Sequence, residues 1–325
     1  MNERGLVLVT GGCGFIGANL IRTLSNNGWN VKVLDNLSVG RKEYLNGVKN
    51  VSFSPGDIRN KEDLSAALAG CSAVVHLAAQ TSVVDSVKDP WMDFEINVEG
   101  FLNLLIACHE KNIEKVVFAS SNAVLGDQEM PINEQKLPCP ISPYGAAKLA
   151  CEAYANTFNS TYGVKTASLR FANVYGPYSL HKESVIHKFI RRAIKGESLH
   201  IYGDGHQTRD FIHADDISEA IIMSLEKDIE GVLQIATGKE TSILEIAELI
   251  RDIHGGNIPI EFKPPRKGEI RRNYSDISKA KSLGYNPKIS IERGIEEVYK
   301  WYKKSQSQIL QVNPNYQIPR RRRLK

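Results

Sequence analysis

The chain has 325 residues, of which 42% are hydrophobic and 24% are charged, and its formal net charge is +4. This length allows one large domain or two smaller ones, and the composition excludes a disordered or fibrous chain. The apolar runs are too short to cross a bilayer, and five scattered cysteines without a CxxC pair suggest neither a disulfide framework nor a metal site. We therefore expect a cytoplasmic protein with reduced thiols.

The first half of the chain alternates two kinds of segment in a regular order. Short, continuously apolar runs indicate buried strands, and the longer segments between them have the apolar spacing of helices. The predicted strands are 6–10, 31–35, 51–53, 73–78, 115–120 and 165–171, and the predicted helices are 15–26, 61–68, 93–110 and 144–162. Buried strands that alternate with helices favour an α/β fold, a doubly wound parallel sheet with helices on both faces.

The pattern changes after residue 172. A long polar loop, a helix near 185–195, a short LHIYGDG segment and two amphipathic helices, EIAELIRDIHG and SIERGIEEVYKWYKK, indicate a smaller, mixed C-terminal domain at the carboxyl edge of the sheet. The segment of about 211–237 is expected to return the chain to the sheet. We therefore divide the chain into a first domain, 1–172 with this return segment, and a second domain, 173–210 with 238–304.

Residues 305–325 are predicted to be a tail, because SQSQILQVNPNYQIP has no helical periodicity. The tail ends in PRRRRLK, whose positive charges leave the rest of the chain close to neutral. Such a block could bind nucleic acid or an anionic membrane surface. Blocks of like charge at chain ends are usually solvated and disordered, so we favour that interpretation and expect no nucleic-acid partner.

A glycine-rich turn, VTGGCGFIG, joins the first predicted strand to the first helix. Gly11, Gly14 and Gly17, with Gly12 as an equivalent first position, let a backbone turn tightly and approach a pyrophosphate, whose charge a helix N-terminus stabilises. Asp35 ends the second strand, where a carboxylate accepts the ribose hydroxyls of NAD and repels the extra phosphate of NADP. A purely structural turn is the alternative, but the strand–turn–helix context favours a Rossmann-type NAD site.

A tyrosine and a lysine stand four residues apart at the start of a predicted helix, in SPYGAAKLA. This spacing places the side chains of Tyr144 and Lys148 on one face of the helix. An ammonium group beside a phenol is expected to stabilise the phenolate and to lower the pKa of Tyr144 toward neutrality. Tyr144 would then act as a general base toward a hydroxyl group. Surface pairs of this kind are common, so the prediction depends on the combination with the glycine turn and an upstream serine.

The chain as a whole resembles the extended short-chain dehydrogenases/reductases, and within them the NAD-dependent nucleotide-sugar epimerases and dehydratases. The resemblance runs from about residue 6 to residue 302, through TGGCGFIG, HLAAQ, INVEG, SS, YGAAK, RFANVYGP, YGDGHQTRDFIHADD and PPRKGEIRRNYSD. It implies an NAD cofactor that stays bound during the reaction. By resemblance, the cofactor contacts are Gly11, Gly14, Phe15, Ile16, Gly17, Asp35, Asn36, Asp57, Ile58, Leu77, Ala78, Ala79, Asn97, Tyr144 and Lys148.

The segment FASSNAVLGD carries two hydroxyls but no carboxylate directly after them. In the family, the position that Ser121 matches bonds the reacting sugar hydroxyl, so the resemblance implies that Ser121 is catalytic together with Tyr144 and Lys148. The related 4,6-dehydratases follow this hydroxyl with an Asp-Glu pair that transfers protons, and decarboxylases typically keep the Glu. Here Asn122 and Ala123 stand in those positions and cannot titrate. The sequence therefore favours oxidation and reduction at one carbon, which is all that epimerisation at C4 requires.

The resemblance also implies a nucleotide-sugar site in the second half of the chain. Guanidinium groups suit a diphosphate, a carboxylate suits the uridine ribose, and a tyrosine ring stacks on uracil. Each arginine alone would be interpreted as part of a surface ion pair, but the order of the matches favours a UDP-sugar substrate. The matched substrate contacts are Ser121, Asn173, Val185, His200, Tyr202, Arg209, Arg266 and Glu269.

The reacting sugar stays open between three candidates. UDP-glucose/UDP-galactose is the first choice, with UDP-N-acetylglucosamine and UDP-glucuronate as alternatives. Asn273 stands where glucose-restricted members often have a tyrosine, so an N-acetyl group would fit, although Tyr274 would reverse this inference after a shift of one residue. His181 and Lys182 offer cations for a uronate, or form a solvated loop. Leu125 replaces a tyrosine that is common in the family, with an undetermined effect on the sugar pocket.

Two other classes of function remain. A net oxidoreductase would consume its cofactor, whereas an epimerase regenerates it. A non-enzymatic NAD-binding protein that uses the basic tail to bind RNA or membranes is disfavoured by the intact Ser121, Tyr144 and Lys148. Family members often form homodimers through two helices of the sheet domain, which we expect to be 93–110 and 144–162.

Overall fold

The computed structural model describes residues 5–266 and 270–312, with side chains up to residue 305. Within these residues, the largest sheet has seven strands, and every neighbouring pair is parallel. Its order, β11-β6-β5-β4-β1-β2-β3, is that of a doubly wound Rossmann-type sheet, which confirms the predicted fold class. The strands are β1 Leu6–Thr10, β2 Asn30–Asp35, β3 Val51–Pro55, β4 Ala73–His76, β5 Lys115–Ser121, β6 Lys165–Phe171 and β11 Gly231–Ile235.

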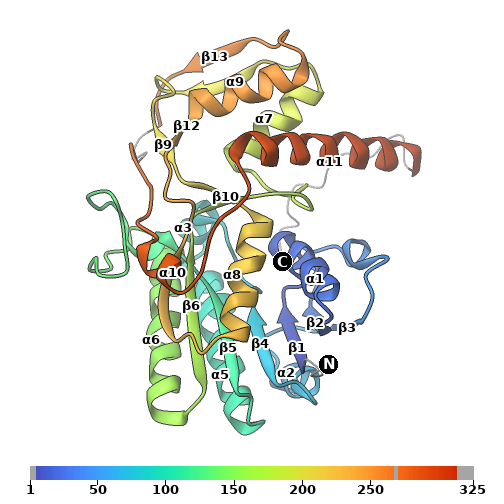
Figure 1. Ribbon diagram of the computed structural model, residues 1–325, viewed down its shortest axis with the longest axis vertical. Helices are drawn as coiled ribbons and strands as arrows, with labels where there is room; N and C mark the ends of the chain where they lie inside the picture. Colours follow the sequence, from blue (N-terminus) through green and yellow to red (C-terminus); the bar gives the residue numbers. More distant parts are fainter. Residues whose placement is uncertain (1–4, 267–269, 313–325) are drawn as a thin grey trace.

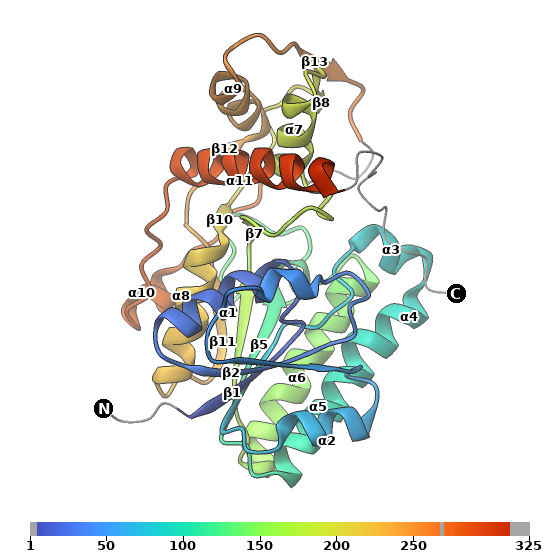
Figure 2. The same cartoon turned by 90° about the vertical axis from the view of Figure 1, so that its right-hand side faces the viewer.

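Helices cover both faces of this sheet (Figures 1 and 2). Helices α1 (Phe15–Asn26) and α8 (Ala214–Glu226) share an apolar cluster with one face, and α2 (Lys61–Leu68), α5 (Gly100–Glu110) and α6 (Pro143–Tyr162) share a cluster with the other. Within β1, Val7 and Val9 belong to the first cluster and Leu8 to the second. The strand is therefore apolar at successive positions because both of its faces are buried.

The region predicted as one helix, 93–110, is divided into several elements. Helix α4 (Pro90–Phe94) leads into a π-helical turn over Glu95–Glu99, and α5 follows it. A short helix that was not predicted, α3 (Val83–Lys88), precedes them, and the side chain of Ser82 caps it by accepting a hydrogen bond from the Asp85 amide at 3.2 Å. Short 3₁₀ turns also occur at Lys42–Leu45 and Asn122–Val124. The apolar periodicity of the sequence does not reveal the π-helical turn, because Asn97 in this turn bonds to Gln80 and Cys151, which are distant in the sequence.

Smaller elements form an upper layer over the carboxyl ends of the sheet strands (Figure 1). Helices α7, α9 and α11 share an apolar cluster that includes Ile190, Ile250 and Val298. Among the described residues, the layer also contains short strand pairs, β10 with β7 and β13 with β8 in parallel, and β12 with β9 antiparallel. The elements of this layer are β7 Asn173–Tyr175, α7 Val185–Ile194, β8 Leu199–Tyr202, β9 Thr208–Arg209, β10 Phe211–His213, β12 Thr241–Ser242, α9 Ile243–His254, β13 Ile260–Lys263 and α11 Ile291–Val312. Helix α10 (Ser278–Ser282) lies outside the layer, against β11 (Figure 1), and its Ala280 belongs to the apolar cluster of the sheet.

The predicted start of the tail at residue 305 is wrong. Helix α11 continues to Val312, although the sequence has no amphipathic pattern after Lys304. Glutamine and leucine are good helix formers, so the helix propagates there on intrinsic propensity. The basic residues at 320–325 lie outside the described part of the chain. Within the described residues, none of the helices combines the length and the hydropathy that a membrane span needs.

Candidate active site

A cavity of about 1550 Å³ lies between the carboxyl ends of the sheet strands and the upper layer. Residues from the β1–α1 turn, the ends of β2, β4 and β5, and the start of α6 line its lower wall. Residues around α7 and β9, with Arg266, Ile270 and Asn273, line the upper one. Ligand pockets usually measure about 300–1,000 Å³, so this cavity has room for more than one ligand. A crevice at the carboxyl ends of the strands is also where doubly wound sheets bind nucleotides.

The glycine turn forms a cradle that only glycine permits. Gly11 has a φ of +70°, and a Cβ atom there would lie 2.6 Å from the Ala78 nitrogen. A Cβ on Gly17 would lie 2.4 Å from the Gly11 carbonyl oxygen. Gly14 precedes α1 as its N-cap without a side-chain hydrogen bond, and Gly14, Phe15, Ile16 and Gly17 line the cavity. The turn therefore fits a pyrophosphate, which such helix N-termini stabilise.

Carboxylates line the cavity beyond this turn. Asp35 accepts the Cys13 amide at 2.9 Å and the Leu37 amide at 2.8 Å, one with each oxygen. Burial raises the pKa of Asp35, and these two hydrogen bonds act in the opposite direction. Asp57 is held by the fork of Arg59, whose hydrogen bonds lower the pKa of Asp57 to about 2, and Asn36 donates to it at 2.9 Å. Asp35 accepts one donor with each oxygen and keeps a lone pair on each for the hydroxyls of a nucleotide ribose, whereas both oxygens of Asp57 already accept two donors each.

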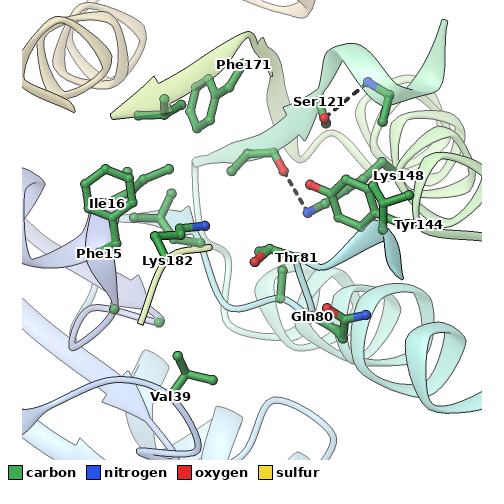
Figure 3. A pocket seen from close by; sticks show the side chains of 18 of the residues that line it. Phe15, Ile16, Val39, Gln80, Thr81, Ser121, Tyr144, Lys148, Phe171 and Lys182 are labelled. Atoms are coloured by element: carbon green, nitrogen blue, oxygen red, sulfur yellow. Dashed lines mark hydrogen bonds between the residues drawn. The ribbon is translucent and has the colours of Figure 1, made fainter. Parts of the chain in front are cut away.

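Ser121, Tyr144 and Lys148 meet on one side of the cavity (Figure 3). Ser121 ends β5, and its hydroxyl accepts a hydrogen bond from the Ala123 amide at 3.2 Å. Ser142 caps α6 by accepting from the Gly145 amide at 3.1 Å, which places Tyr144 in the first turn of the helix. The buried Lys148 ammonium donates to the Ala119 carbonyl at 2.8 Å. The sequence prediction brought these three residues together correctly, and their catalytic roles are a matter of proposal.

The ionisation of this group differs from the prediction. Burial raises the pKa of Tyr144 to about 12, and the hydrogen bond with Ser121 lowers it without outweighing burial. Burial also lowers the pKa of Lys148 to about 8. The Lys148 nitrogen lies 5.9 Å from the centroid of the Tyr144 ring. Lys148 is not among the groups that lower the pKa of Tyr144 here, so the expected shift toward neutrality is not found, and a base at this position needs further positive charge nearby.

Asn97 lies behind the cavity wall rather than in it. Its side chain accepts the Gln80 amide and donates to the Gln80 carbonyl, both at 3.0 Å, and it also donates to Asp93 at 3.0 Å. The Cys151 thiol of α6 donates to the Asn97 carbonyl. Asn97 therefore fixes the loop after β4, whose Gln80 lines the cavity, and it ties this loop to the helix that carries Tyr144.

The upper wall holds four of the eight predicted substrate residues. Arg209 and Arg266 line the cavity, and the Arg266 guanidinium stacks 3.9 Å from the Tyr202 ring centroid. Tyr202 itself lies just outside the lining. His200 points elsewhere and contacts Arg192 at 3.1 Å, so its predicted place at the substrate is not found. Glu269 lies outside the described residues.

The cavity lining includes most of the predicted residues. The predicted residues on its wall are Gly11, Gly14, Phe15, Ile16, Gly17, Asp35, Asn36, Asp57, Ile58, Leu77, Ala78, Ala79, Ser121, Tyr144, Lys148, Asn173, Val185, Arg209 and Arg266.

Three positions that bear on the sugar are also placed. Asn273 lines the cavity, whereas the Tyr274 carbonyl accepts the Ile132 amide and Tyr274 is not part of the lining. The smaller residue of the two is therefore the one on the cavity wall. Leu125 is fully buried in a small apolar cluster with Ile132, so it does not shape the cavity wall directly. Asn122, whose amide donates to Ser275 at 3.0 Å, lines the cavity without offering a titratable group.

Sequence reasoning missed several residues of the wall. Val39, Thr81 and Phe171 line the cavity and are labelled in Figure 3. His181 and Lys182, for which a solvated loop was one interpretation, also belong to the lining. Thr81 and Phe171 follow or end predicted strands at the carboxyl edge, so position along the strand was a usable signal. The direction of the Lys182 side chain had no signal in the sequence.

The comparison with protein families agrees with this geometry. Residues 7–236 match the model of the "NAD dependent epimerase/dehydratase family". The chain belongs to this family. The predicted NAD cofactor is thereby confirmed, and the glycine cradle and Asp35 are the features that fit it.

Relatives in this epimerase/dehydratase family differ in the sugar that their names give. The chain is 40% identical to a putative UDP-glucose 4-epimerase of Methanocaldococcus jannaschii, over 92% of this chain and 98% of the relative. It is 33% identical to a UDP-glucuronate 4-epimerase of Thermodesulfobacterium geofontis, over 93% and 97% of the two chains. Among solved structures, a UDP-N-acetylglucosamine 4-epimerase of Methanobrevibacter ruminantium, in complex with UDP-N-acetylmuramic acid, superposes with a TM-score of 0.89 and 38% identity, over 93% and 99% of the two chains.

Proposed function

We propose that this protein is an NAD-dependent UDP-sugar 4-epimerase, an isomerase, whose substrates are UDP-glucose and UDP-galactose. The observation that carries the proposal is the composition of the cavity wall around Ser121. Tyr144 and Lys148 provide proton transfer at one carbon, while Asn122 and Ala123 supply no second acid or base for dehydration. The named relatives support the 4-epimerase reaction.

Each catalytic side chain has a distinct task in this proposal. Tyr144 removes the proton of the sugar 4-hydroxyl as C4 is oxidised, and returns it when the ketone is reduced on its other face. Ser121 hydrogen-bonds the reacting oxygen, and Lys148 keeps an ammonium group beside the pair from its anchor on Ala119. When bound, NAD supplies the hydride acceptor and a positively charged nicotinamide ring, and such a charge favours ionisation of a neighbouring phenol.

The two walls of the cavity suit a substrate that is held at one end. Arg209 and Arg266 offer two guanidinium groups to a nucleoside diphosphate, and Arg266 is supported from behind by the ring of Tyr202. On this basis we propose that residues 173–210 and 238–304, which form most of the upper layer, are the substrate domain and that 1–172 with 211–237 is the NAD domain. A diphosphate held on the upper wall leaves the sugar free to turn over between oxidation and reduction.

Two other sugars have specific support. The small Asn273 on the cavity wall leaves space for an N-acetyl group, which favours UDP-N-acetylglucosamine as a second candidate. His181 and Lys182 on the same wall offer cations to UDP-glucuronate. We keep UDP-glucose/UDP-galactose first, because neither feature excludes the smaller neutral sugar.

We also propose a homodimer, formed through the helices near 93–110 and 144–162. Large apolar side chains are exposed on and beside these helices: Trp91 (68% exposed), Phe94 (45%), Ile106 (37%), Tyr154 (39%) and Tyr162 (47%). The rings of Trp91 and Phe94 stack with centroids 5.6 Å apart. Clusters of exposed apolar residues often mark protein interfaces. A cytoplasmic location, expected from the unpaired cysteines, also stays a prediction.

The test follows the anomeric protons of UDP-glucose, UDP-N-acetylglucosamine and UDP-glucuronate by NMR, each with purified protein and no added NAD. Appearance of the C4 epimer of one sugar supports the proposal and identifies the substrate. Tyr144→Phe should abolish this turnover while bound NAD is retained, and Tyr154→Phe on the exposed side of α6 is the matched control. Net formation of NADH, or no epimer even with added NAD, would contradict the epimerase proposal.

A further inference from the structure

We infer that Lys182 is a clamp for the cofactor: its ammonium group binds the pyrophosphate of NAD from the side opposite the glycine turn and slows NAD release. The loop that carries Lys182 lies between β7 and α7, in the upper layer, whereas the glycine turn belongs to the sheet. A contact from this loop would therefore close the cofactor between the two layers.

The Lys182 loop is firmly anchored. Ser179 is fully buried, its hydroxyl donates to the Gly176 carbonyl at 2.6 Å, and its carbonyl accepts the Tyr302 hydroxyl at 2.8 Å. The Lys182 amide donates to the same Ser179 carbonyl at 2.8 Å. Arg191 of α7 donates to the Lys182 carbonyl at 2.5 Å and to the Glu183 carboxylate at 2.8 Å. These bonds tie the backbone around Lys182 to α7 and α11, so the point from which its side chain starts is fixed.

The Lys182 side chain points into the cavity beside the start of α1. In Figure 3 it lies next to Phe15 and Ile16, with its nitrogen directed toward the middle of the cavity. The nitrogen is 5.6 Å from the centroid of the Phe15 ring, and Phe15 is the first residue of α1 after the Gly14 cap. Since the pyrophosphate of a dinucleotide sits at this helix N-terminus, Lys182 is placed to meet its charge from above.

This placement has a consequence for the reaction cycle. An epimerase regenerates its cofactor, so NAD that is released slowly can serve many reaction cycles without rebinding. This advantage rests on the proposed function, whereas the contact between Lys182 and the pyrophosphate depends only on NAD binding. A charge-assisted contact in a partly closed cavity is expected to slow dissociation about tenfold or more.

The test compares Lys182→Ala, Lys182→Arg and Lys188→Ala. Lys188 of α7 is the matched control: it is a lysine six residues away, its side chain is 43% exposed and pairs with Glu183 at 3.4 Å, and it lies outside the cavity lining. NAD content is measured after gel filtration, and the release rate is measured by exchange with fluorescent etheno-NAD at several salt concentrations. We expect about tenfold faster release and a weaker salt dependence for Lys182→Ala only, with Lys182→Arg close to the parent protein.

Two results would overturn the inference. One is an unchanged release rate in Lys182→Ala. The other is a Lys182→Ala variant that keeps NAD normally but loses binding of UDP-glucuronate relative to UDP-glucose, which would assign the cation to a sugar carboxylate. The NAD release rate is measured without turnover. A failure of the epimerase assay would therefore contradict the proposed function but not the role of Lys182 in holding NAD.

Discussion

Replacing Glu152 by alanine should destabilise the protein by about 3–5 kcal/mol, the range for breaking a buried ion pair. Glu152 lies one helical turn after Lys148 on α6, and its two oxygens accept the Arg170 guanidinium of β6 at 2.9 and 2.7 Å. The hydroxyl of Ser120 on β5 donates to the same carboxylate. The side chains of Arg170 and Glu152 are 3% and 5% exposed, so alanine would leave a guanidinium buried without its counter-charge.

The surroundings of Arg170 give little compensation for this loss. Among the described residues, its third nitrogen, Nη1, is already buried without a hydrogen-bond partner. The expected loss is a large fraction of the stability of a typical protein, about 5–15 kcal/mol. It should also loosen the contact between α6 and the strand that carries Ser121.

Urea unfolding with NAD in excess, followed by circular dichroism, measures the effect. Glu152→Ala should lower the midpoint at an unchanged slope, whereas Glu219→Ala, at an exposed position of α8, should change stability by less than about 0.5 kcal/mol. A double variant, Glu152→Met with Arg170→Met, should regain most of the loss, since apolar residues often replace a buried pair without cost. A loss below about 1 kcal/mol in the single variant, or a double variant less stable than the single one, would refute this reasoning.

Three further predictions concern the site. Gly11→Ala should abolish NAD retention in gel filtration. Gly28→Ala, at a similar φ of +78° but with open space around it, should retain NAD and lower the free energy of unfolding by only about 1–2 kcal/mol. Equal NAD retention in the two variants would contradict the role of the glycine turn. The charge of Asp93 raises the pKa of Tyr144, so Asp93→Asn should lower this pKa and move the acidic limb of the kcat profile to lower pH, and an upward shift would contradict it. Asn273→Tyr should reduce kcat/KM for UDP-N-acetylglucosamine more than for UDP-glucose, and a uniform reduction would remove Asn273 from the sugar site.

Much of the sheet could be predicted from the sequence, because its signals are local. The bounds of β1, β6, α1 and α2 agree to the residue with the predicted ones. Their strands are buried on both faces and their helices are amphipathic, so each element is defined by its own residues. The glycine turn, Asp35 and Ser121 could be placed together from the sequence, since each lies at the carboxyl end of a parallel strand.

The remainder depended on contacts between distant segments. Asn97 was expected beside the cofactor, but its bonds to Gln80 and Asp93 place it behind the wall. The pKa of Tyr144 follows from burial, which a spacing of four residues cannot report. His200 and Lys182 both lie in the upper layer, and only the fold decides that the first points away from the cavity and the second into it.

The late return of β11 to the sheet affects how the protein can be made. β6 gains its outer neighbour only when residues 231–235 pair with it in register, after β7, α7 and α8 have been synthesised. Until then the nascent chain presents the backbone of an apolar strand at an open edge, a template for association with other chains. We expect a fragment of residues 1–172 to aggregate and the full chain to remain dispersed, which sedimentation would check. Any shortened form, natural or engineered, would therefore have to keep the chain through β11 to cover this edge.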